Sequence, residues 1–450
     1  MFAETRKDPS GAKRKKIFLP YAEFASEVQP EAQKYLVYLV YWGLFLLVAF
    51  LWTANAQAQT VQVLHWWTST SEEKAIATLS GRMAQENIVW KNAVIPSGSG
   101  IGAGIVLKSR MLAGDAPEVA QLNGVIISEW ADLGLLQELD PVASSGKWEK
   151  SLFPTVWRLI QPKGHPVAVP LGIHRINTLF YNRKIFARYD LSPPKNWDEF
   201  EAIAKKLQQA GITPLAQSAE PWQLATLFET LVLSESDANF YRDAFVKKSP
   251  QAFVDPRFGR ALSRLRSLKK YMPALLSEQT WIASTRMLAD GDAAMLVMGD
   301  WAKGELNSWG IATDVGFSCA AVPNTANYHL YNIDTLVMLD KGATVRSAQE
   351  KIAQIAVLPA LQTEYNQIKG SIPVLRNPEL NKMDSCSQTS WKIFSRGSAF
   401  QVPSLAHRMA TDEISKDAII AEIMRFFSND SLSVSDTQKR LAAISHTLPK

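Results

Sequence analysis

The alternation of strands and helices is the strongest constraint on the fold of this 450-residue chain. From residue 61 to residue 133, apolar runs of strand length alternate with longer segments of helical periodicity, and short links join them. The expected strands are 61–67, 89–95 and 117–123, and the expected helices are 71–84, 101–113 and 127–133. This order predicts an α/β fold around a largely parallel sheet.

The same alternation continues at longer spacing through the rest of the chain. The expected strands there are 166–173, 178–182 and 293–301, and the expected helical regions are 197–211, 222–288, 348–368 and 415–428. A length near 390 after residue 58 favours two or three domains, or one domain of two lobes.

The first 58 residues have the layout of an export segment. The uncharged run 35–52 follows several Lys and Arg residues and precedes the small residues Ala54, Ala56 and Ala58. This order is typical of a cleaved secretory signal, although eighteen apolar residues also suffice for an N-terminal membrane anchor. On either interpretation the remainder is exported, and we expect cleavage and a periplasmic location.

Charge and cysteine content exclude several function classes. With seven Lys or Arg and five Asp or Glu in residues 1–58, the remainder has a net charge of only +3 and no basic run, so we expect no nucleic-acid partner. Cys319 and Cys386 form no CxxC or Cys/His cluster, so no metal site or cofactor is expected. Two buried thiols are compatible with the pattern, but a pairing across a lobe boundary would stabilise an exported chain, and we predict it.

Six motifs in a fixed order carry a family resemblance. They are WWTSxxE (66–72), AQLNG (120–124), HRINTLFYN (174–182), MGDWAKGE (298–305), KGSIP (369–373) and PSLAH (403–407). Together they resemble the periplasmic sugar-binding proteins of carbohydrate ABC importers. The similarity is to the maltose-binding type, or family 1 extracellular solute-binding proteins, and most of all to their glucose-binding branch. It covers roughly residues 60–450.

The resemblance implies a two-lobed type II periplasmic-binding-protein fold with a hinge and an interlobe sugar site. After a signal peptide or anchor at 1–58, we expect the chain to cross between lobes near 172 and to return within 290–306. The expected lobes are 59–172 with 292–345, and 173–291 with 346–450.

The implied function is the substrate-binding component of an ABC sugar importer. The expected ligand is a glucose-like monosaccharide or a small oligosaccharide. The expected partner is a pair of permease subunits, a chemoreceptor is a further compatible partner, and the protein is expected to be a monomer without enzymatic activity.

The indole doublet Trp66-Trp67 is the first candidate for the ligand site. Neighbouring strand residues point to opposite faces, so one core surface cannot bury both rings. Sugars present apolar C–H faces to aromatic platforms, and ligands of α/β sheets bind at the carboxyl ends of strands. We expect Trp67 to meet the ligand and Trp66 to be the more structural ring, although two structural indoles would fit the residue pattern as well.

The resemblance also implies polar and aromatic ligand contacts elsewhere. Three of them have other possible roles: Asp300 could cap a helix, Lys369 could be a solvated cation at a helix end, and His407 could be a core histidine. His174 and Asn177 could either line the crevice or tie the hinge. Asn123 stands where the glucose binders have lysine, which changes the expected hydroxyl pattern. The expected contacts are Glu72, Asn123, His174, Trp281 (ranked above Trp222), Asp300, Trp301, Lys369 and His407.

An exported carbohydrate hydrolase is the alternative from another class. Its two carboxylates would be Glu72 and Asp300. Nothing in the sequence indicates that one of them has a raised pKa while the other stays ionised, as such a pair requires.

Overall fold

The computed structural model describes residues 35, 37–42, 58–96, 101–274 and 279–449. Most of the predicted export segment, including Ala54 and Ala56, lies outside these residues, and residues 37–42 are helical. Among the described residues, every helix falls short of the length or the hydropathy that crossing a bilayer requires. Residues 58–450 form one compact unit.

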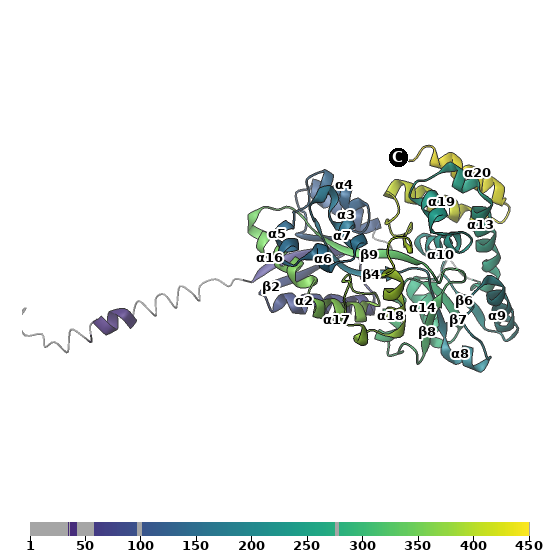
Figure 1. Ribbon diagram of the computed structural model, residues 1–450, viewed down its shortest axis with the longest axis horizontal. Coiled ribbons are helices and arrows are strands. Elements are labelled where there is room, and N and C mark those ends of the chain that lie inside the picture. The colour runs from purple at the N-terminus through teal and green to yellow at the C-terminus, as the bar shows by residue number, and fades with distance from the viewer. Residues whose placement is uncertain (1–34, 36, 43–57, 97–100, 275–278, 450) are drawn as a thin grey trace, which may run out of the picture. The chain divides into compact units, whose positions relative to one another are not determined.

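Two sheets organise this unit (Figure 1). The six-stranded sheet has the order β10-β9-β3-β1-β2, and β4 also pairs with β9. The four-stranded sheet has the order β6-β7-β5-β8. The strands of the first sheet are β1 (Gln59–His65), β2 (Ile88–Val94), β3 (Val119–Gln121), β4 (Ala168–Arg175), β9 (His329–Met338) and β10 (Gln401–Pro403). Those of the second are β5 (Thr178–Asn182), β6 (Thr213–Ala216), β7 (Ala293–Met298) and β8 (Phe317–Ala321).

Both sheets are mixed, whereas the sequence predicted a largely parallel one. Strands β1, β2 and β3 are parallel to one another, as the alternation requires. Strand β9 runs antiparallel to both β3 and β4, and β5 runs antiparallel to β7 and β8. The antiparallel pair β4 and β9 carries the chain between the two halves of the unit, and this crossing could not be read from local periodicity.

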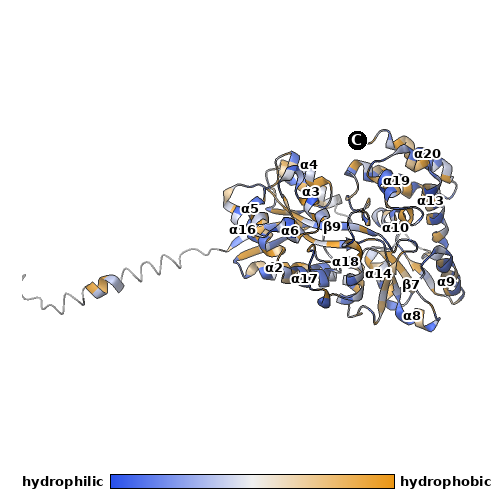
Figure 2. Ribbon diagram, in the orientation of Figure 1, coloured by the Kyte–Doolittle hydropathy of each residue, from blue (hydrophilic) through white to orange (hydrophobic). Residues whose placement is uncertain are grey.

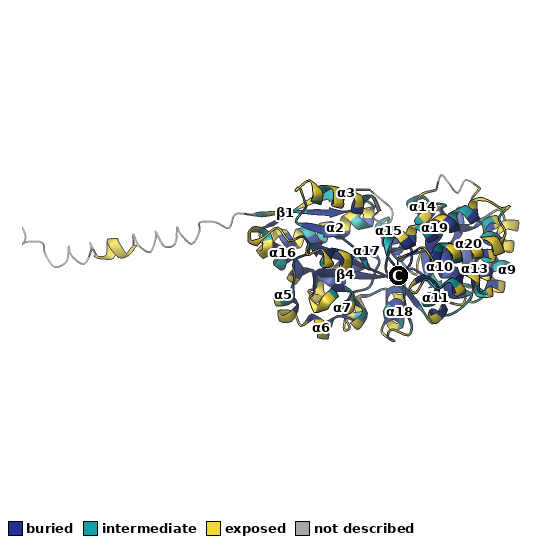
Figure 3. Cartoon of the chain, turned by 90° about the horizontal axis from the view of Figure 1, so that it is seen from above, coloured by how far each residue is buried: buried dark blue, intermediate teal, exposed yellow. Residues whose placement is uncertain are grey.

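Two large hydrophobic cores define two lobes, which appear side by side in Figure 1 and as two buried centres in Figure 3. The first lobe has its core residues within 61–173 and 333–394, with Met409 added. The second has its core residues within 176–330 and 402–448. The predicted first crossing near 172 agrees with this division.

The predicted return at 290–306 is wrong. Strand β7 pairs with β5 and β6 and stays in the second lobe, and the chain returns on β9 instead. The expected lobe boundaries at 291/292 and 345/346 are therefore corrected: 292–330 belongs to the second lobe, and most of 346–394 belongs to the first. A third crossing lies between Phe394 and Val402.

Helices cover the sheets, whose strands are mostly apolar while many helices have one polar side (Figure 2). In the first lobe they are α2 (Thr70–Ala84), α3 (Ile101–Leu112), α4 (Ile126–Asp132), α5 (Asp140–Ser145), α6 (Trp148–Ser151), α7 (Pro154–Ile160), α16 (Ala343–Ala356), α17 (Pro359–Lys369) and α18 (Ser385–Phe394). In the second they are α8 (Arg183–Arg188), α9 (Trp197–Gln209), α10 (Pro221–Ser234), α11 (Ala238–Phe245), α12 (Pro250–Val254), α13 (Pro256–Leu268), α14 (Trp281–Asp290), α15 (Trp301–Ser308), α19 (Glu413–Ser428) and α20 (Val434–Ser445).

Proline divides two regions that were expected to be continuously helical. The region 348–368 breaks at Leu358, because Pro359 occupies the first turn of α17 and the residue before a proline avoids the helical conformation. The described part of 222–288 contains five α-helices, three of which have a proline in the first turn.

The two lobes meet closely where α15 of the second lobe contacts α17 of the first. A Cβ atom on Gly304 would lie 2.6 Å from the Lys369 carbonyl oxygen. Gly370, at φ +94°, would place one 2.2 Å from the Asp300 carbonyl oxygen. Only glycine permits this approach of backbone to backbone. Beside it, the Glu305 carboxylate accepts hydrogen bonds from Thr70 N and Ser71 N at the start of α2, at 3.2 and 2.9 Å.

A disulfide joins the lobes at a second point. Cys319 on β8 is bonded to Cys386 on α18, 67 residues later. Met383 and Phe394, before and within α18, pack in the core of the first lobe, whereas β8 belongs to the sheet of the second. The predicted pairing across the lobe boundary is confirmed.

Replacing both cysteines by serine should lower the free energy of unfolding by roughly 2 to 4 kcal/mol, because the cross-link no longer restricts the unfolded chain. Urea unfolding of the oxidised protein and of Cys319→Ser/Cys386→Ser measures the difference. Titration of the native oxidised protein should find no free thiol. Two thiols that react independently would contradict the bond.

Candidate functional site

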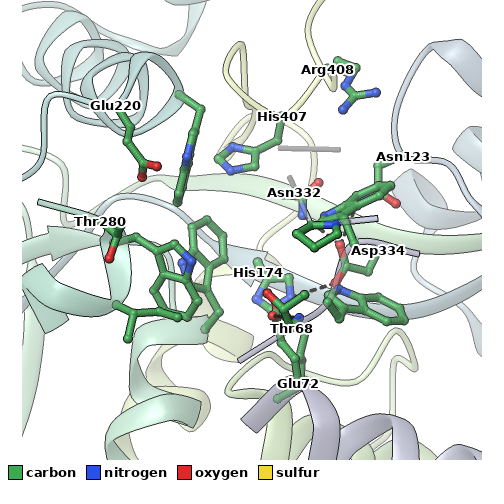
Figure 4. Close-up of a pocket in the computed structure, with 18 residues that line it drawn as sticks. Thr68, Glu72, Asn123, His174, Glu220, Thr280, Asn332, Asp334, His407 and Arg408 are labelled. Carbon is green, nitrogen blue, oxygen red and sulfur yellow. Dashed lines mark hydrogen bonds and ion pairs between the residues drawn. The ribbon is translucent and has the colours of Figure 1, made fainter. Parts of the chain in front are cut away.

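A cavity of about 430 Å³ lies between the two lobes (Figure 4). Nine of the ten predicted contact residues line it, and Asp300 is the exception. In Figure 4, Glu220 and Thr280 of the second lobe face Asn123 of the first, with His174 and His407 between them. The full lining is Trp66, Trp67, Thr68, Glu72, Pro96, Asn123, His174, Glu220, Trp222, Thr280, Trp281, Ile282, Trp301, Asn332, Asp334, Lys369, His407 and Arg408.

Glu72 is positioned by the start of α2. Ser69 is the N-cap, and Ser69 and Glu72 form a reciprocal capping box. One oxygen of Glu72 accepts from Thr68 N and Ser69 N at 2.9 and 3.1 Å, and the other accepts from the Lys369 ammonium at 2.8 Å. Most of the acceptor capacity that we expected Glu72 to offer a ligand is therefore used within the protein.

The Glu72–Lys369 ion pair is buried, with the two side chains 12% and 3% exposed. Burial alone would raise the pKa of Glu72, but the Lys369 cation and the backbone N–H groups hold it below its usual value. Burial would likewise lower the pKa of Lys369, and Glu72 and Asp334 raise it instead. Both groups are charged at neutral pH, and the burial of Lys369 excludes the solvated-cation alternative.

His174 lies at the centre of the cavity floor, near the end of β4. Its Nδ1 is 2.5 Å from Asp300 Oδ1, and its Nε2 is 3.2 Å from Asp334 Oδ2. Burial lowers the pKa of His174, but the two carboxylates outweigh it and the pKa is raised. With a carboxylate at each nitrogen, the ring is held as an imidazolium that donates in both directions.

Asp300 supports His174 rather than lining the cavity. Its second oxygen accepts from the Arg175 backbone N at 2.9 Å. It is the N-cap residue of α15, but its side chain makes no capping hydrogen bond. The expected direct contact between Asp300 and a ligand is therefore corrected, because both oxygens are directed at the crossing strand β4.

Asp334 on β9 is a cavity residue that the sequence analysis missed. One oxygen accepts from Asn123 Nδ2 at 2.8 Å and from Asn332 Nδ2 at 3.1 Å, while the other faces His174. Burial would raise the pKa of Asp334, but the His174 and Lys369 cations and the Asn123 amide lower it well below its usual value. Asp334 is therefore ionised, and Asn123 serves partly to hold it.

The remaining crossing residue, Asn177, ties the hinge and does not line the cavity. Its amide donates to Thr325 Oγ1 at 3.0 Å and its oxygen accepts from Leu330 N at 3.0 Å. His174 thus both lines the crevice and ties the hinge, whereas Asn177 only ties the hinge.

The indole doublet contributes both rings to the cavity. Trp67 is only 2% exposed and belongs to the core of the first lobe, while Trp66 is half-buried against that core. This relative burial is the reverse of our expectation, because strand alternation assigns the rings to two faces but does not say which face is better covered. Arg408, which the sequence analysis also missed, lies with its guanidinium 5.9 Å from the centre of the Trp66 ring.

Aromatic rings of the second lobe form the opposite side of the cavity. Trp301 lies 6.1 Å from Trp222 and 5.2 Å from His407, measured between ring centres. Trp222 therefore lines the cavity together with Trp281, although the sequence analysis ranked it lower. The polar segment around Trp222 was its one visible sign, and Glu220 and Thr280 add polar groups on this side.

His407 is a half-buried, neutral histidine at the cavity. Its Nδ1 is 2.9 Å from Ser404 Oγ. Burial, with the nearby His174 cation, lowers the pKa of His407 to about 3, although the Asp334 carboxylate opposes the shift. The ring stays uncharged at neutral pH.

The fold and the site together define a class: a two-lobed α/β protein with a polar, aromatic-lined cavity between its lobes. Residues 68–350 match the model of the bacterial extracellular solute-binding protein family. A relative from Brucella suis named as a sugar-binding periplasmic protein is 34% identical over 87% of this chain and 93% of its own length. A relative of the same name from Rhizobium meliloti is 31% identical over 87% of this chain and 95% of its own length.

Solved structures show the same two-lobed fold. The bacterial solute receptor AcbH superposes with a TM-score of 0.75 at 17% identity, over 87% of this chain and 99% of AcbH. AcbH is described as having an exclusive substrate preference for β-D-galactopyranose. Maltose-bound MalE3 of T. maritima superposes with a TM-score of 0.72 at 16% identity, over 87% and 100%. This chain belongs to the bacterial extracellular solute-binding protein family, as the six motifs indicated.

Lys369→Met should lower the free energy of unfolding by roughly 3 to 5 kcal/mol, because it leaves the Glu72 carboxylate buried without its cation. The double variant Lys369→Met/Glu72→Gln should recover part of this loss, because no unpaired charge remains. Urea unfolding of the three proteins checks both expectations. Equal stability of Lys369→Met and the unaltered protein would contradict the role given to the pair.

The free energy of unfolding should also fall at low pH, because Glu72 becomes protonated there. Its folded pKa lies below the ordinary value of 4.5, so its stabilising contribution is present above that value and is lost as the pH falls through the folded pKa. Glu72→Gln should therefore show a shallower loss of unfolding free energy below about pH 4.5 than the unaltered protein. Parallel denaturation series at stepwise lower pH measure the two slopes, and identical slopes would remove Glu72 from the acid response.

Proposed function

We propose that this protein is the extracytoplasmic binding component of an ABC importer and that it carries a sugar between its two lobes. The observation that carries the proposal is the cavity itself, in which indole rings from both lobes flank a chain of buried, alternating charges. Apolar ring faces match the C–H faces of a sugar, and fixed charged groups match its hydroxyls. The names of the Brucella and Rhizobium relatives support both the ligand class and the exported location.

The ligand that we propose is a glucose-like hexose or a small oligosaccharide. The cavity volume of about 430 Å³ is within the range of small-molecule sites. Its lining includes acceptors and donors from both lobes, among them the Glu220 carboxylate of the second lobe and the Thr68 hydroxyl of the first. A hydroxyl both donates and accepts, so a sugar could satisfy either kind of group.

Electrostatics argue against a hydrolase built on the expected carboxylate pair. Glycoside hydrolysis needs a carboxylic acid whose pKa is raised, so that it can protonate the leaving group. The pKa values of Glu72 and Asp334 are both lowered, and Asp300 is directed away from the cavity. We therefore propose a non-enzymatic binding protein, acting as a monomer that passes its ligand to permease subunits or presents it to a chemoreceptor.

A thermal-shift screen against monosaccharides and disaccharides tests the ligand class. A sugar present at 100 times its Kd should stabilise the folded protein by roughly 2.7 kcal/mol. Aryl glycosides incubated with the protein should not be cleaved. The absence of a shift with every sugar, or turnover of a glycoside, would overturn the proposal.

Truncating the indoles should separate a ligand platform from a core residue. Trp66→Ala should weaken sugar binding by roughly 1 to 3 kcal/mol with a small loss of stability, because this ring lines the cavity and is only half-buried. Trp67→Ala should lower the unfolding free energy by roughly 3 to 5 kcal/mol, because it removes a core aromatic. Calorimetry for binding and urea unfolding for stability measure the two effects.

Trp90→Ala is the matched control, because Trp90 packs partly buried against the same core and does not line the cavity. It should bind sugar as the unaltered protein does. If Trp66→Ala also binds normally, that indole is not the platform.

A further inference from the structure

A buried carboxyl group lies directly behind the cavity lining. Glu229, on α10, is 0% exposed and forms no ion pair within the described part of the chain. Its Oε2 accepts from the Tyr241 hydroxyl at 2.6 Å and from Leu405 N at 2.5 Å, and its Oε1 accepts from Ser404 Oγ at 2.7 Å. These hydrogen bonds join α10 to α11 and to the segment that follows β10.

Ser404 connects Glu229 to the cavity residue His407. The Ser404 oxygen accepts from the His407 backbone N at 3.2 Å and is 2.9 Å from His407 Nδ1. Because the single hydroxyl proton of Ser404 is directed at Glu229, the ring must carry its own proton on Nδ1 and donate it to Ser404. The other ring nitrogen, Nε2, then has a lone pair, and it hydrogen-bonds none of the described residues.

We propose that Glu229 is a positioning residue that selects the tautomer of His407 through Ser404, and so decides whether Nε2 accepts or donates a hydrogen bond in the cavity. With Glu229 ionised, Nε2 is an acceptor and favours a ligand hydroxyl that donates. This last step rests on the proposed function, whereas the tautomer itself does not.

Protonation of Glu229 reverses the direction of the whole chain. The new O–H of Glu229 donates to Ser404 Oγ, so the Ser404 hydroxyl turns and donates to His407 Nδ1. The ring loses its proton from Nδ1 to solvent and gains one on Nε2, which becomes a donor. Glu229 has gained one proton from solvent, and the ring remains neutral throughout.

The electrostatics place this change in the physiological range. Burial raises the pKa of Glu229 to about 7, against the opposing hydrogen bonds from Tyr241 and Ser404. Burial also raises the pKa of Tyr241 well above its usual value, so it remains a donor. The charged groups that act on His407 are His174, Asp334, Arg408 and Lys416. Burial and the three cations outweigh the Asp334 carboxylate and keep the ring neutral while Glu229 titrates.

Nitrogen-15 NMR of the imidazole groups tests the proposal in the ligand-free protein. Between about pH 5.5 and 8.5, His407 should change from the Nε2–H to the Nδ1–H tautomer with a midpoint near pH 7. Glu229→Gln should hold the Nε2–H tautomer at every pH. Its amide oxygen would face the donors Tyr241 and Leu405 N, leaving the NH₂ group to donate to Ser404.

Three further variants complete the experiment. Ser404→Ala should abolish the pH response of His407, because the link is removed. Tyr241→Phe should move the midpoint upward, because the carboxylate loses a donor, and this variant keeps the test available if Glu229→Gln does not fold. Glu422→Gln is the matched control: Glu422 is a buried carboxylate of the same lobe paired with Arg425 and Arg440, and its variant should respond as the unaltered protein does.

A single His407 tautomer across the pH range, shared by the unaltered protein and Glu229→Gln, would overturn the proposal, as would an unchanged midpoint in Tyr241→Phe. The spectra are recorded without sugar, so a failure of the sugar assignment leaves their result intact. Where a sugar does bind, its affinity in Glu229→Gln should lose the pH dependence that the unaltered protein shows near pH 7.

Discussion

The hydrogen bonds of His174 to two carboxylates are the interaction on which the rest of the site depends. Asp300 stands at the turn between β7 and α15 in the second lobe, and Asp334 stands on the strand that returns to the first. A neutral imidazole could donate a hydrogen bond to only one of these carboxylates, so bonding to both requires the protonated ring. Three segments far apart in the sequence are thereby held at one point, where the cavity floor lies.

Charge alternation extends this arrangement from the floor to the side of the cavity. Asp334 interacts electrostatically with Lys369. Lys369 is paired with Glu72, which also belongs to the capping box of α2. Each charge is compensated by a neighbour, so the network is stable without a ligand, although removing any one member would leave another uncompensated. A ligand therefore meets polar groups that are already oriented, which lowers the entropy lost on binding.

The sequence allowed the local elements and many cavity residues to be predicted, because these have local signs. Strand β5 coincides with the predicted 178–182, and the doublet Trp66-Trp67 was conspicuous because it could not be buried on one face. Asp334 was missed because the sequence analysis predicted no strand over 329–338, and because its partners come together only in three dimensions. The lobe assignment of β7 failed for the same reason, since strand pairing is not a local property.

The contact of α15 with α17 has a mechanical consequence. Gly304 and Gly370 bring main chain against main chain, so no side chain there can change rotamer to accommodate a tilt of one lobe. Any change in the angle between the lobes would have to come from backbone torsions in the three crossing segments. A single methyl group added at either glycine would force the two backbones apart, so the relative position of the lobes depends on the absence of a side chain at both positions.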